Sequence, residues 1–446
     1  MTVLSWMAEP PPTTALVDAG GDRVLGYREL ADRVAALAEG LRRPRKSLVI
    51  CPCGPDVDTV LAYLASLHAG HAVLLADAER PGLLPALVER FGAAFVVGPH
   101  QQIQEFEHSP DVHPDLAVLL ATSGSTGNAK YVRLSHGALN ANAEQIGSAL
   151  DLDETGRAVQ SLPLHYSYGL SVLNSHLQAR GSVVFSAHSV VTRGFWNDVA
   201  EHRCTSFAGV PFSFTILDRI GFPRMALPAL RTLTHAGGRM PAEAIVRYAT
   251  LMEDRGGRFY SMYGQTEATA RMSVVPWRQA VEKAGTIGLP VPHGDFETAD
   301  DGELIYRGPN VMMGYAESYG DLALGDVVGG TLPTGDLGQQ DDDGFYYLVG
   351  RKSRIAKVAG YRINLDDVGA MSEAGPMVAV EHNEQVVIVR ERRPGGMSAE
   401  ELSRHIGNYV GLPSRFFRVQ EVDALPMTGT GKIDISAVSE GVVQSS

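Results

Sequence analysis

The sequence predicts an α/β protein with a large N-terminal domain and a smaller C-terminal domain. Segments with apolar residues at helical spacing alternate with short apolar runs as far as about residue 257, as in helices layered on largely parallel sheets. After about Thr286, short strand-like runs between Asp/Gly turns take over, and from Arg351 a new mixture of strands and helices begins. A chain of 446 residues is also too long for one compact domain. We therefore expect residues 1–350 to form a large domain of α/β layers with a small β-rich subdomain, and residues 351–446 to form a small α+β domain.

The N-terminal elements show the alternation most clearly. Residues 27–43 have the spacing of an amphipathic helix, and the apolar run at 46–53 has the length of a strand. Residues 58–70 predict a second helix that ends at a glycine, followed by a strand at 71–76. A further helix is expected over residues 136–150.

The β-rich subdomain is expected from short runs at 302–309 and 343–351. The three acids and glycine of "DDDGF" (residues 341–345) are interpreted as a hairpin turn rather than a cation site. The C-terminal residues predict a hairpin and helix over 354–373, then a strand, a helix, a strand and a closing helix at 385–393, 398–410, 416–422 and 433–440.

The composition excludes several classes of protein. The 38 basic and 51 acidic residues give a formal charge of −13, which argues against non-specific nucleic-acid binding and against an anionic membrane surface. Cys51, Cys53 and Cys204 are too few for a disulfide framework and lack partners at metal-ligand spacing, so buried thiols in a reducing compartment are expected. No signal peptide and no run of about 20 apolar residues is visible, so we expect a cytoplasmic protein.

One loop gives the first indication of which ligand the protein binds. "ATSGSTGNAKYVRLSH" (Ala121 to His136) follows the apolar run at 116–121 and precedes the helix expected at 136–150, where backbone N–H groups can converge on an anion. It departs from the common phosphate loop, in which the lysine directly follows the last glycine. A flexible Ser/Gly linker is the alternative, but a linker rarely follows a buried strand directly. We interpret the loop as wrapping a polyphosphate through hydroxyls, glycines and a cation: Thr122, Ser123, Gly124, Ser125, Thr126, Gly127 and Lys130.

Further motifs follow in an order that resembles one family. "TSGSTGNAK" resembles the phosphate loop of adenylate-forming enzymes, which include acyl-CoA synthetases, the adenylation domains of peptide synthetases and luciferase. "THAGGRM" (234–240) and "YSMYGQTEAT" (260–269) are similar to the family's diglycine and Y-G-x-T-E motifs. "TGD", "GR" and "PMTGTGKID" (426–434) match its later motifs. Each motif alone is of modest specificity, but their order is a strong signal.

The resemblance implies a nucleotide site. Gly237 and Gly238 would flank the adenine, and Tyr263, followed by Gly264, would pack on it. Thr266 would donate to the α-phosphate, and Glu267 would coordinate Mg²⁺, because a carboxylate beside phosphates must hold a cation.

The resemblance also implies roles for residues later in the chain. Asp336 would accept the ribose hydroxyls, Arg351 would reach the same sugar, and Lys432 would be the catalytic lysine. A mobile C-terminal domain would swing about a hinge in "GRKSR", where Ser353 replaces the usual Asp or Lys. Gly360 would lie where the thiol of the second step approaches.

The acid would bind beside "PLHYSYGLSVLNSHL" (163–177) and "FAGVPFSF" (207–214). His165 and Tyr166 suggest a polar, partly aromatic wall, or rings that merely pack around the loop. Phe207 and Gly209 would line the same pocket, and bulky rings there would favour a small or aromatic acid. His188, His235 and His293 show no metal-ligand spacing and are expected to be surface or packing histidines.

The expected activity is ATP-dependent activation of a small carboxylic acid as an acyl-adenylate, with release of pyrophosphate and transfer to a thiol. The thiol would belong to coenzyme A or to the phosphopantetheine of an acyl or peptidyl carrier protein, for which Arg390, Arg392 and Arg393 would offer a basic patch. Capture of the adenylate by an amine or another non-thiol nucleophile, a luciferase-like oxygenase and a non-catalytic nucleotide-binding regulator remain alternatives.

Overall fold

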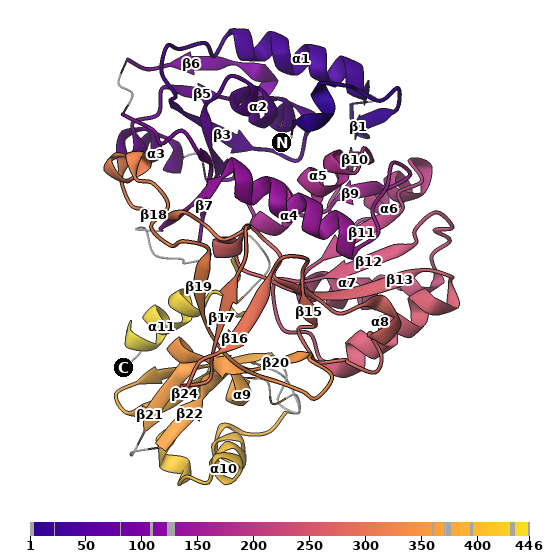
Figure 1. The fold of residues 1–446 in the computed structure, drawn as a ribbon. Coiled ribbons are helices and arrows are strands. Elements are labelled where there is room, and N and C mark those ends of the chain that lie inside the picture. Colours follow the sequence, from indigo (N-terminus) through magenta and orange to yellow (C-terminus); the bar gives the residue numbers. More distant parts are fainter. Residues whose placement is uncertain are drawn as a thin grey trace.

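The computed structural model describes residues 4–21, 23–80, 82–107, 110–122, 130–358, 361–369, 371, 376–392, 396–428 and 433–444. These residues form five sheets, two of them large. Figure 1 shows the elements beyond Arg351 grouped at one end of the molecule, opposite the N-terminal sheet. The mixed α/β architecture predicted from the sequence is confirmed.

The first large sheet has seven strands around a parallel centre. Strands β3, β4, β5 and β7 run parallel, while β6, β8 and β18 pair antiparallel at the edges. Their order and bounds are β18 (Gly314–Ala316), β8 (Tyr131–Ser135), β7 (Leu116–Ala121), β4 (Ala72–Asp77), β3 (Leu48–Cys53), β5 (Phe95–Val97) and β6 (Ile103–Glu105).

The second large sheet has nine strands, and its central strands are parallel. Antiparallel pairs occur at both ends, where β2 joins β1 and where β14 joins β13 and β15. Its order and bounds are β15 (Leu289–Pro290), β14 (Ser273–Val274), β13 (Arg258–Tyr263), β12 (Thr232–His235), β11 (Ser206–Gly209), β9 (Arg157–Gln160), β10 (Ser182–Phe185), β1 (Thr14–Asp18) and β2 (Arg23–Gly26).

Helices cover both large sheets. Successive side chains of a strand point to opposite faces of its sheet, so they pack against different helices. In β3, Val49 and Cys51 join the core beneath α1 and α2, whereas Leu48 and Ile50 join the core beneath α3. Helices α4 and α5 contribute to the cores of both sheets, and α6, α7 and α8 cover the other face of the nine-stranded sheet. The bounds are α1 (Tyr27–Glu39), α2 (Val57–His68), α3 (Leu83–Phe91), α4 (His136–Ala149), α5 (Ser167–Gln178), α6 (Arg193–Glu201), α7 (Pro211–Arg219) and α8 (Ala242–Asp254).

The expected β-rich subdomain is an antiparallel four-stranded sheet. Its order is β16 (Asp295–Thr298), β17 (Glu303–Arg307), β19 (Thr331–Gln340) and β20 (Tyr346–Arg351). The predicted "DDDGF" turn joins β19 to β20, and the backbone N–H of Asp341 donates to Phe345 at 2.8 Å. Asp341 also accepts a hydrogen bond from Lys283 at 3.1 Å, which the sequence did not indicate.

Beyond Arg351 the described residues form a hairpin, three α-helices and a three-stranded sheet. The hairpin is β21 (Ile355–Val358) with β22 (Tyr361–Asn364), and the sheet is β23 (Met377–His382), β24 (Gln385–Glu391) and β25 (Phe417–Val422). The helices are α9 (Leu365–Gly369), α10 (Ala399–Val410) and α11 (Ile435–Gln444). A domain boundary between residues 350 and 351 remains a prediction.

The element that follows the predicted phosphate loop differs from the one expected from the sequence. The segment after β7 leads into a second strand, β8, antiparallel to β7, and only then into α4. The expectation that the loop directly precedes a helix N-terminus is therefore wrong. The run "YVRLS" pairs on both sides, with β7 and β18, and this pairing depends on partners distant in sequence.

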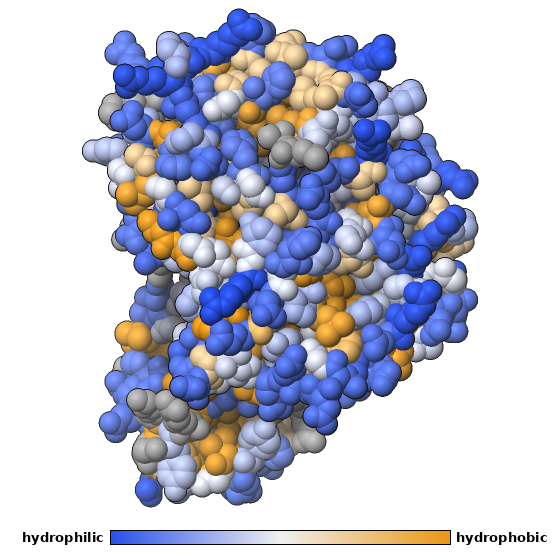
Figure 2. All heavy atoms as spheres, in the orientation of Figure 1, coloured by the Kyte–Doolittle hydropathy of each residue, from blue (hydrophilic) through white to orange (hydrophobic). Residues whose placement is uncertain are grey.

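Two further sequence-based expectations concern thiols and membranes. Cys51, Cys53 and Cys204 are buried and free, as predicted. Within the described ranges, no helix combines the length and the apolar character needed to cross a bilayer. The face drawn in Figure 2 is mostly polar, with apolar side chains in small separate groups.

Candidate active site

The predicted site residues follow the carboxyl ends of neighbouring parallel strands. His165 and Tyr166 come after β9, Gly237 after β12, and Glu267 after β13. Strands β9, β11, β12 and β13 are adjacent in the nine-stranded sheet. In open α/β sheets, ligands bind at this edge.

Asp336 is the centre of a buried cluster. The register of β19 and β20 pairs it directly with Arg351, whose Nε lies 2.7 Å from Asp336 Oδ1. Tyr263 donates its hydroxyl to Asp336 Oδ2, and Gln265 Nε2 donates to the same oxygen at 3.0 Å. Asp336 is only 1% exposed. The predicted adenine and ribose residues Tyr263, Asp336 and Arg351 therefore lie together.

The charges within this cluster reinforce one another. Burial, and then the Asp336 carboxylate, raise the pKa of Tyr263 well above its usual value, so the phenol keeps its proton and donates. Burial alone would lower the pKa of Arg351, but the neighbouring Asp336, Tyr263 and Asp366 together raise the pKa above its usual value. A carboxylate has about four lone-pair positions. Arg351, Tyr263 and Gln265 use three of them, so accepting two ribose hydroxyls requires one of these donors to move.

Glu267 is linked to Lys130 through an aromatic side chain. Tyr315 on β18 donates to Glu267 Oε1 at 2.9 Å, and burial followed by the Glu267 charge raises the pKa of Tyr315. Lys130 Nζ lies 5.7 Å from the centre of the Tyr315 ring and 3.2 Å from Glu317 Oε1. Pairing of β18 with β8 places these residues side by side.

Thr266 faces the start of α5. Its hydroxyl lies 3.1 Å from that of Ser167, the first residue of α5. Gly264 permits the tight turn before it, because a Cβ there would lie 1.7 Å from the Ala270 carbonyl oxygen. Thr266 is thus held beside Glu267 at the end of β13.

The diglycine stretch lies against Tyr166, one of the residues predicted to line the binding pocket for the carboxylic acid. Gly237 has φ +84°, and a Cβ at this position would lie 2.3 Å from the hydroxyl oxygen of Tyr166. A Cβ at Gly238 would lie 3.0 Å from Pro211 Cγ. Burial raises the pKa of Tyr166 to about 12, so its hydroxyl stays protonated.

The other residues predicted to line the acid pocket are His165, Phe207 and Gly209, and their surroundings differ. His165 is half-buried, burial lowers its pKa, and its Nδ1 is buried without a hydrogen-bond partner in the described structure. Phe207 borders an internal cavity, but its ring packs 5.5 Å from that of Trp196, among the helices on the far face of the sheet. The expectation that Phe207 lines the acid pocket stays a prediction. Gly209 allows close packing of α7, since a Cβ there would lie 3.0 Å from Ser213 Cβ.

Several predicted residues lie outside the described ranges: Ser123, Gly124, Ser125, Thr126, Gly127, Gly360, Arg393 and Lys432. Thr122 and Lys130 frame the first of these segments, and the Thr122 N–H donates to the Lys130 carbonyl at 3.0 Å. The ends of the predicted phosphate loop are therefore close together.

The donor set fits magnesium held jointly with phosphates. No group of three or more His, Cys, Asp or Glu side chains that could hold a metal occurs in the part of the chain that the structure describes. Magnesium, however, typically uses one or two carboxylates together with substrate phosphates and water. Glu267 can supply that single carboxylate.

Sequence analysis did not identify Tyr315, Gln265 or Ser167 as parts of this site. Gln265 lies inside the Y-G-x-T-E motif at its variable position, so its place in the motif was the available signal. Tyr315 is 48 residues from Glu267, and Ser167 is 99 residues from Thr266. Local sequence carries no signal for contacts at such separations.

This chain is similar in sequence to known AMP-binding enzymes. The family model for AMP-binding enzymes matches residues 85–316. A feruloyl-CoA synthase from Amycolatopsis sp is 29% identical over 96% of this chain and 95% of its own length. An oxalate–CoA ligase from Arabidopsis thaliana is 30% identical over 74% of this chain and 68% of its own length.

Solved structures of other proteins share this fold. The o-succinylbenzoate coenzyme A synthetase of Bacillus subtilis, solved with ATP and a magnesium ion, superposes with a TM-score of 0.77 at 21% identity, covering 98% of each chain.

The chain belongs to the AMP-binding enzyme family. It is an AMP-forming ligase that uses ATP to activate a carboxylic acid for transfer to a thiol.

Proposed function

We propose that this enzyme converts a small carboxylic acid into its coenzyme A thioester through an acyl-adenylate held at the carboxyl ends of β9, β11, β12 and β13. The observation that carries the proposal is the convergence of the Asp336 cluster and the Glu267–Tyr315–Lys130 group on residues 263–267. In the first step an acid oxygen bonds to the α-phosphorus of ATP and pyrophosphate leaves. In the second step the thiol sulfur takes the acyl group, AMP leaves and the thiol proton is released.

Different residues would bind different parts of the nucleotide. Tyr263, Asp336 and Arg351 would hold the nucleoside, and Thr266 would donate to the α-phosphate. Bound Mg²⁺ supplies positive charge that stabilises the departing pyrophosphate. Lys130 and Lys432 would add fixed positive charge, because preorganised donors stabilise charge that develops during the reaction.

Coenzyme A is the acceptor favoured over a carrier protein. The names of the relatives refer to coenzyme A. In the proposed carrier patch, Arg390 is 5% exposed and lies 2.7 Å from Glu421, and Arg392 lies 3.8 Å from both Glu421 and Asp423. These acids neutralise Arg390 and Arg392, so the described part of the patch offers little charge to an acidic carrier.

ATP–pyrophosphate exchange tests the first step. Purified enzyme, Mg²⁺ and labelled pyrophosphate are incubated with each member of a panel of aliphatic, aromatic and amino acids. We expect exchange with at least one acid, and an acyl-CoA product when coenzyme A is added. Exchange with no acid would contradict the proposed ligase activity, and exchange without any thioester product would contradict coenzyme A as acceptor.

A further inference from the structure

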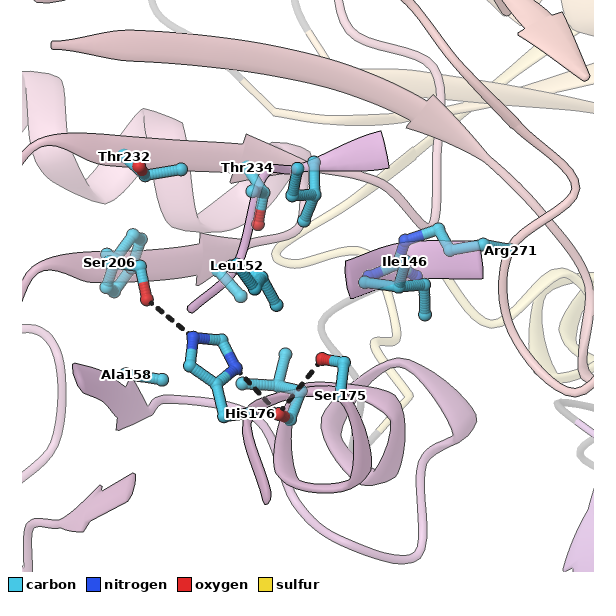
Figure 3. Close-up of a pocket in the computed structure, with 13 residues that line it drawn as sticks. Ile146, Leu152, Ala158, Ser175, His176, Ser206, Thr232, Thr234 and Arg271 are labelled. Carbon is cyan, nitrogen blue, oxygen red and sulfur yellow. Dashed lines mark hydrogen bonds between the residues drawn. The ribbon is translucent and has the colours of Figure 1, made fainter. Parts of the chain in front are cut away.

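The buried arginines of this chain differ in what they contact. Arg271 borders a small internal cavity between α4, α5 and the nine-stranded sheet (Figure 3), where its guanidinium carbon lies 4.0 Å from the centre of the Tyr168 ring. Arg133, on β8, is 0% exposed and donates hydrogen bonds to four backbone carbonyls instead. Burying a charge is costly unless hydrogen bonds or an opposite charge compensate it. The carbonyls that these bonds reach show what Arg133 stabilises.

The four carbonyls belong to the two ends of one partly exposed segment. At its start, Arg133 Nη2 donates to the Met313 carbonyl at 2.9 Å, and Nε donates to the Tyr315 carbonyl at 3.1 Å. At its end, Nη1 donates to the Leu324 carbonyl, and both Nη atoms lie 3.2 Å from the Gly325 carbonyl oxygen. A guanidinium has five N–H donors in a fixed fork, so one side chain can hold both ends of the segment.

Backbone contacts hold the same segment, residues 313–325, directly against Arg133. The Met313 N–H donates to the Arg133 carbonyl at 2.8 Å, and the Val327 N–H donates to the Met313 carbonyl at 3.0 Å. Gly314 has φ +128°, and a Cβ there would lie 2.8 Å from Arg133 Nη2. The glycine therefore allows the segment to approach the guanidinium closely.

The 313–325 segment carries two side chains that contact the proposed phosphate end of the site. Tyr315 donates its hydroxyl to Glu267 Oε1 at 2.9 Å, and Glu317 Oε1 lies 3.2 Å from Lys130 Nζ. The carbonyl of Tyr315 accepts from Arg133, so the same residue is held at its backbone and contacts Glu267 through its side chain. A shift of the segment would therefore break the hydrogen bond that orients the Glu267 carboxylate.

We infer that Arg133 is a positioning residue for the Mg²⁺ end of the site: it fixes the 313–325 segment so that Tyr315 holds one oxygen of the Glu267 carboxylate and leaves the other for the metal. The inference rests on the proposed function, in which Glu267 holds Mg²⁺. Buried charged groups can specify one conformation of a chain even where they add little stability. Arg133 acts on the reaction through Tyr315 and Glu267, rather than by contact with ATP.

A double-mutant cycle on metal binding tests the inference. Mn²⁺, used in place of Mg²⁺, is titrated into the enzyme–ATP complex without any acid, so that no turnover occurs, and free Mn²⁺ is measured by electron paramagnetic resonance. Loss of a residue that orients a metal ligand typically weakens metal binding by about 10- to 100-fold. Because ATP phosphates supply further ligands, Arg133→Met and Tyr315→Phe should each weaken Mn²⁺ binding by about 10-fold. The variant with both substitutions should show the same loss of about 10-fold, because Arg133 acts through Tyr315.

Control variants separate a positioning role from a purely structural one. Arg390→Met removes another buried arginine, on β24, and should leave Mn²⁺ binding at wild-type strength even if it lowers stability in urea. If Arg133→Met does not fold, Arg133→Lys takes its place, because lysine keeps the charge but loses the fork. Wild-type Mn²⁺ affinity in the folded Arg133 variant, or losses that multiply in the double variant, would overturn the inference. A wild-type enzyme that exchanges pyrophosphate with no acid would instead overturn the proposed function.

Discussion

The carboxylate of Glu267 accepts one hydrogen bond within the described structure, from Tyr315, through Oε1. Its second oxygen is therefore available to a cation. Lys130, by contrast, is paired with Glu317, and both side chains are more than half exposed. A pair so exposed contributes little to stability, so Lys130 can exchange Glu317 for a phosphate at small cost.

Glu267→Gln should lower ATP–pyrophosphate exchange by about 10²- to 10³-fold, because an amide cannot supply the charge that holds Mg²⁺ beside the phosphates. The measurement is the exchange rate over a Mg²⁺ titration, in which the variant should also require more metal. Glu317→Gln is the matched control and should stay within a few-fold of wild type. A Glu267→Gln enzyme with wild-type exchange would remove this residue from the metal site.

At the scale of elements, α5 packs against the nine-stranded sheet through a buried histidine. The Nε2 of His176 lies 3.2 Å from Ser206 Oγ on β11, and its Nδ1 lies 2.8 Å from the Val172 carbonyl oxygen. Burial lowers the pKa of His176 to about 4. The helix–sheet contact therefore depends on a neutral imidazole.

This contact predicts a loss of stability in acid. The unfolded chain has a His pKa near 6.5 and binds the proton first as the pH falls. The stability is thus complete above about pH 6.5 and declines toward pH 4, with a slope of up to about 1.4 kcal/mol per pH unit from this group. Urea unfolding at several pH values should show a shallower decline in His176→Gln. The exposed His68→Gln should keep the wild-type slope, and a wild-type slope in His176→Gln would refute the assignment.

For the whole molecule, ion pairs join the elements on either side of Arg351, and one of them includes the buried Glu303. Lys352 Nζ lies 2.7 Å from both Asp301 and Glu303, and Arg239 lies 3.8 Å from Asp367. Ion pairs between exposed groups contribute little to stability. The Lys352–Asp301 and Arg239–Asp367 pairs are of this kind, so they would open at small cost in the mobile C-terminal domain that the family resemblance implies.

Lys432→Ala tests whether the C-terminal part completes the site. Adenylate formation should fall by about 10²- to 10³-fold, because the substitution would remove the donor that the family resemblance assigns to the reacting oxygens. The affinity for ATP should stay near that of wild type, since other residues hold the nucleotide. Single-turnover adenylation and equilibrium ATP binding measure the two effects separately. Adenylation within a few-fold of normal would show that Lys432 is not the catalytic lysine.

Much of the fold could be predicted because helical and strand periodicity are local. The helix expected at 27–43 is observed as Tyr27–Glu39, and the strand expected at 71–76 is Ala72–Asp77. The strand β8 was missed, because "YVRLS" follows a polar loop directly and becomes a strand through pairing with β7 and β18.

The sequence alone determined the α/β layering and the order of the motifs, since both are encoded within short stretches of chain. Only the tertiary structure decided that Tyr315 reaches Glu267, that the Phe207 ring packs against Trp196, and that Arg271 is buried beside a cavity. The physical reason is that side-chain direction, burial and charge pairing depend on neighbours brought from distant parts of the chain.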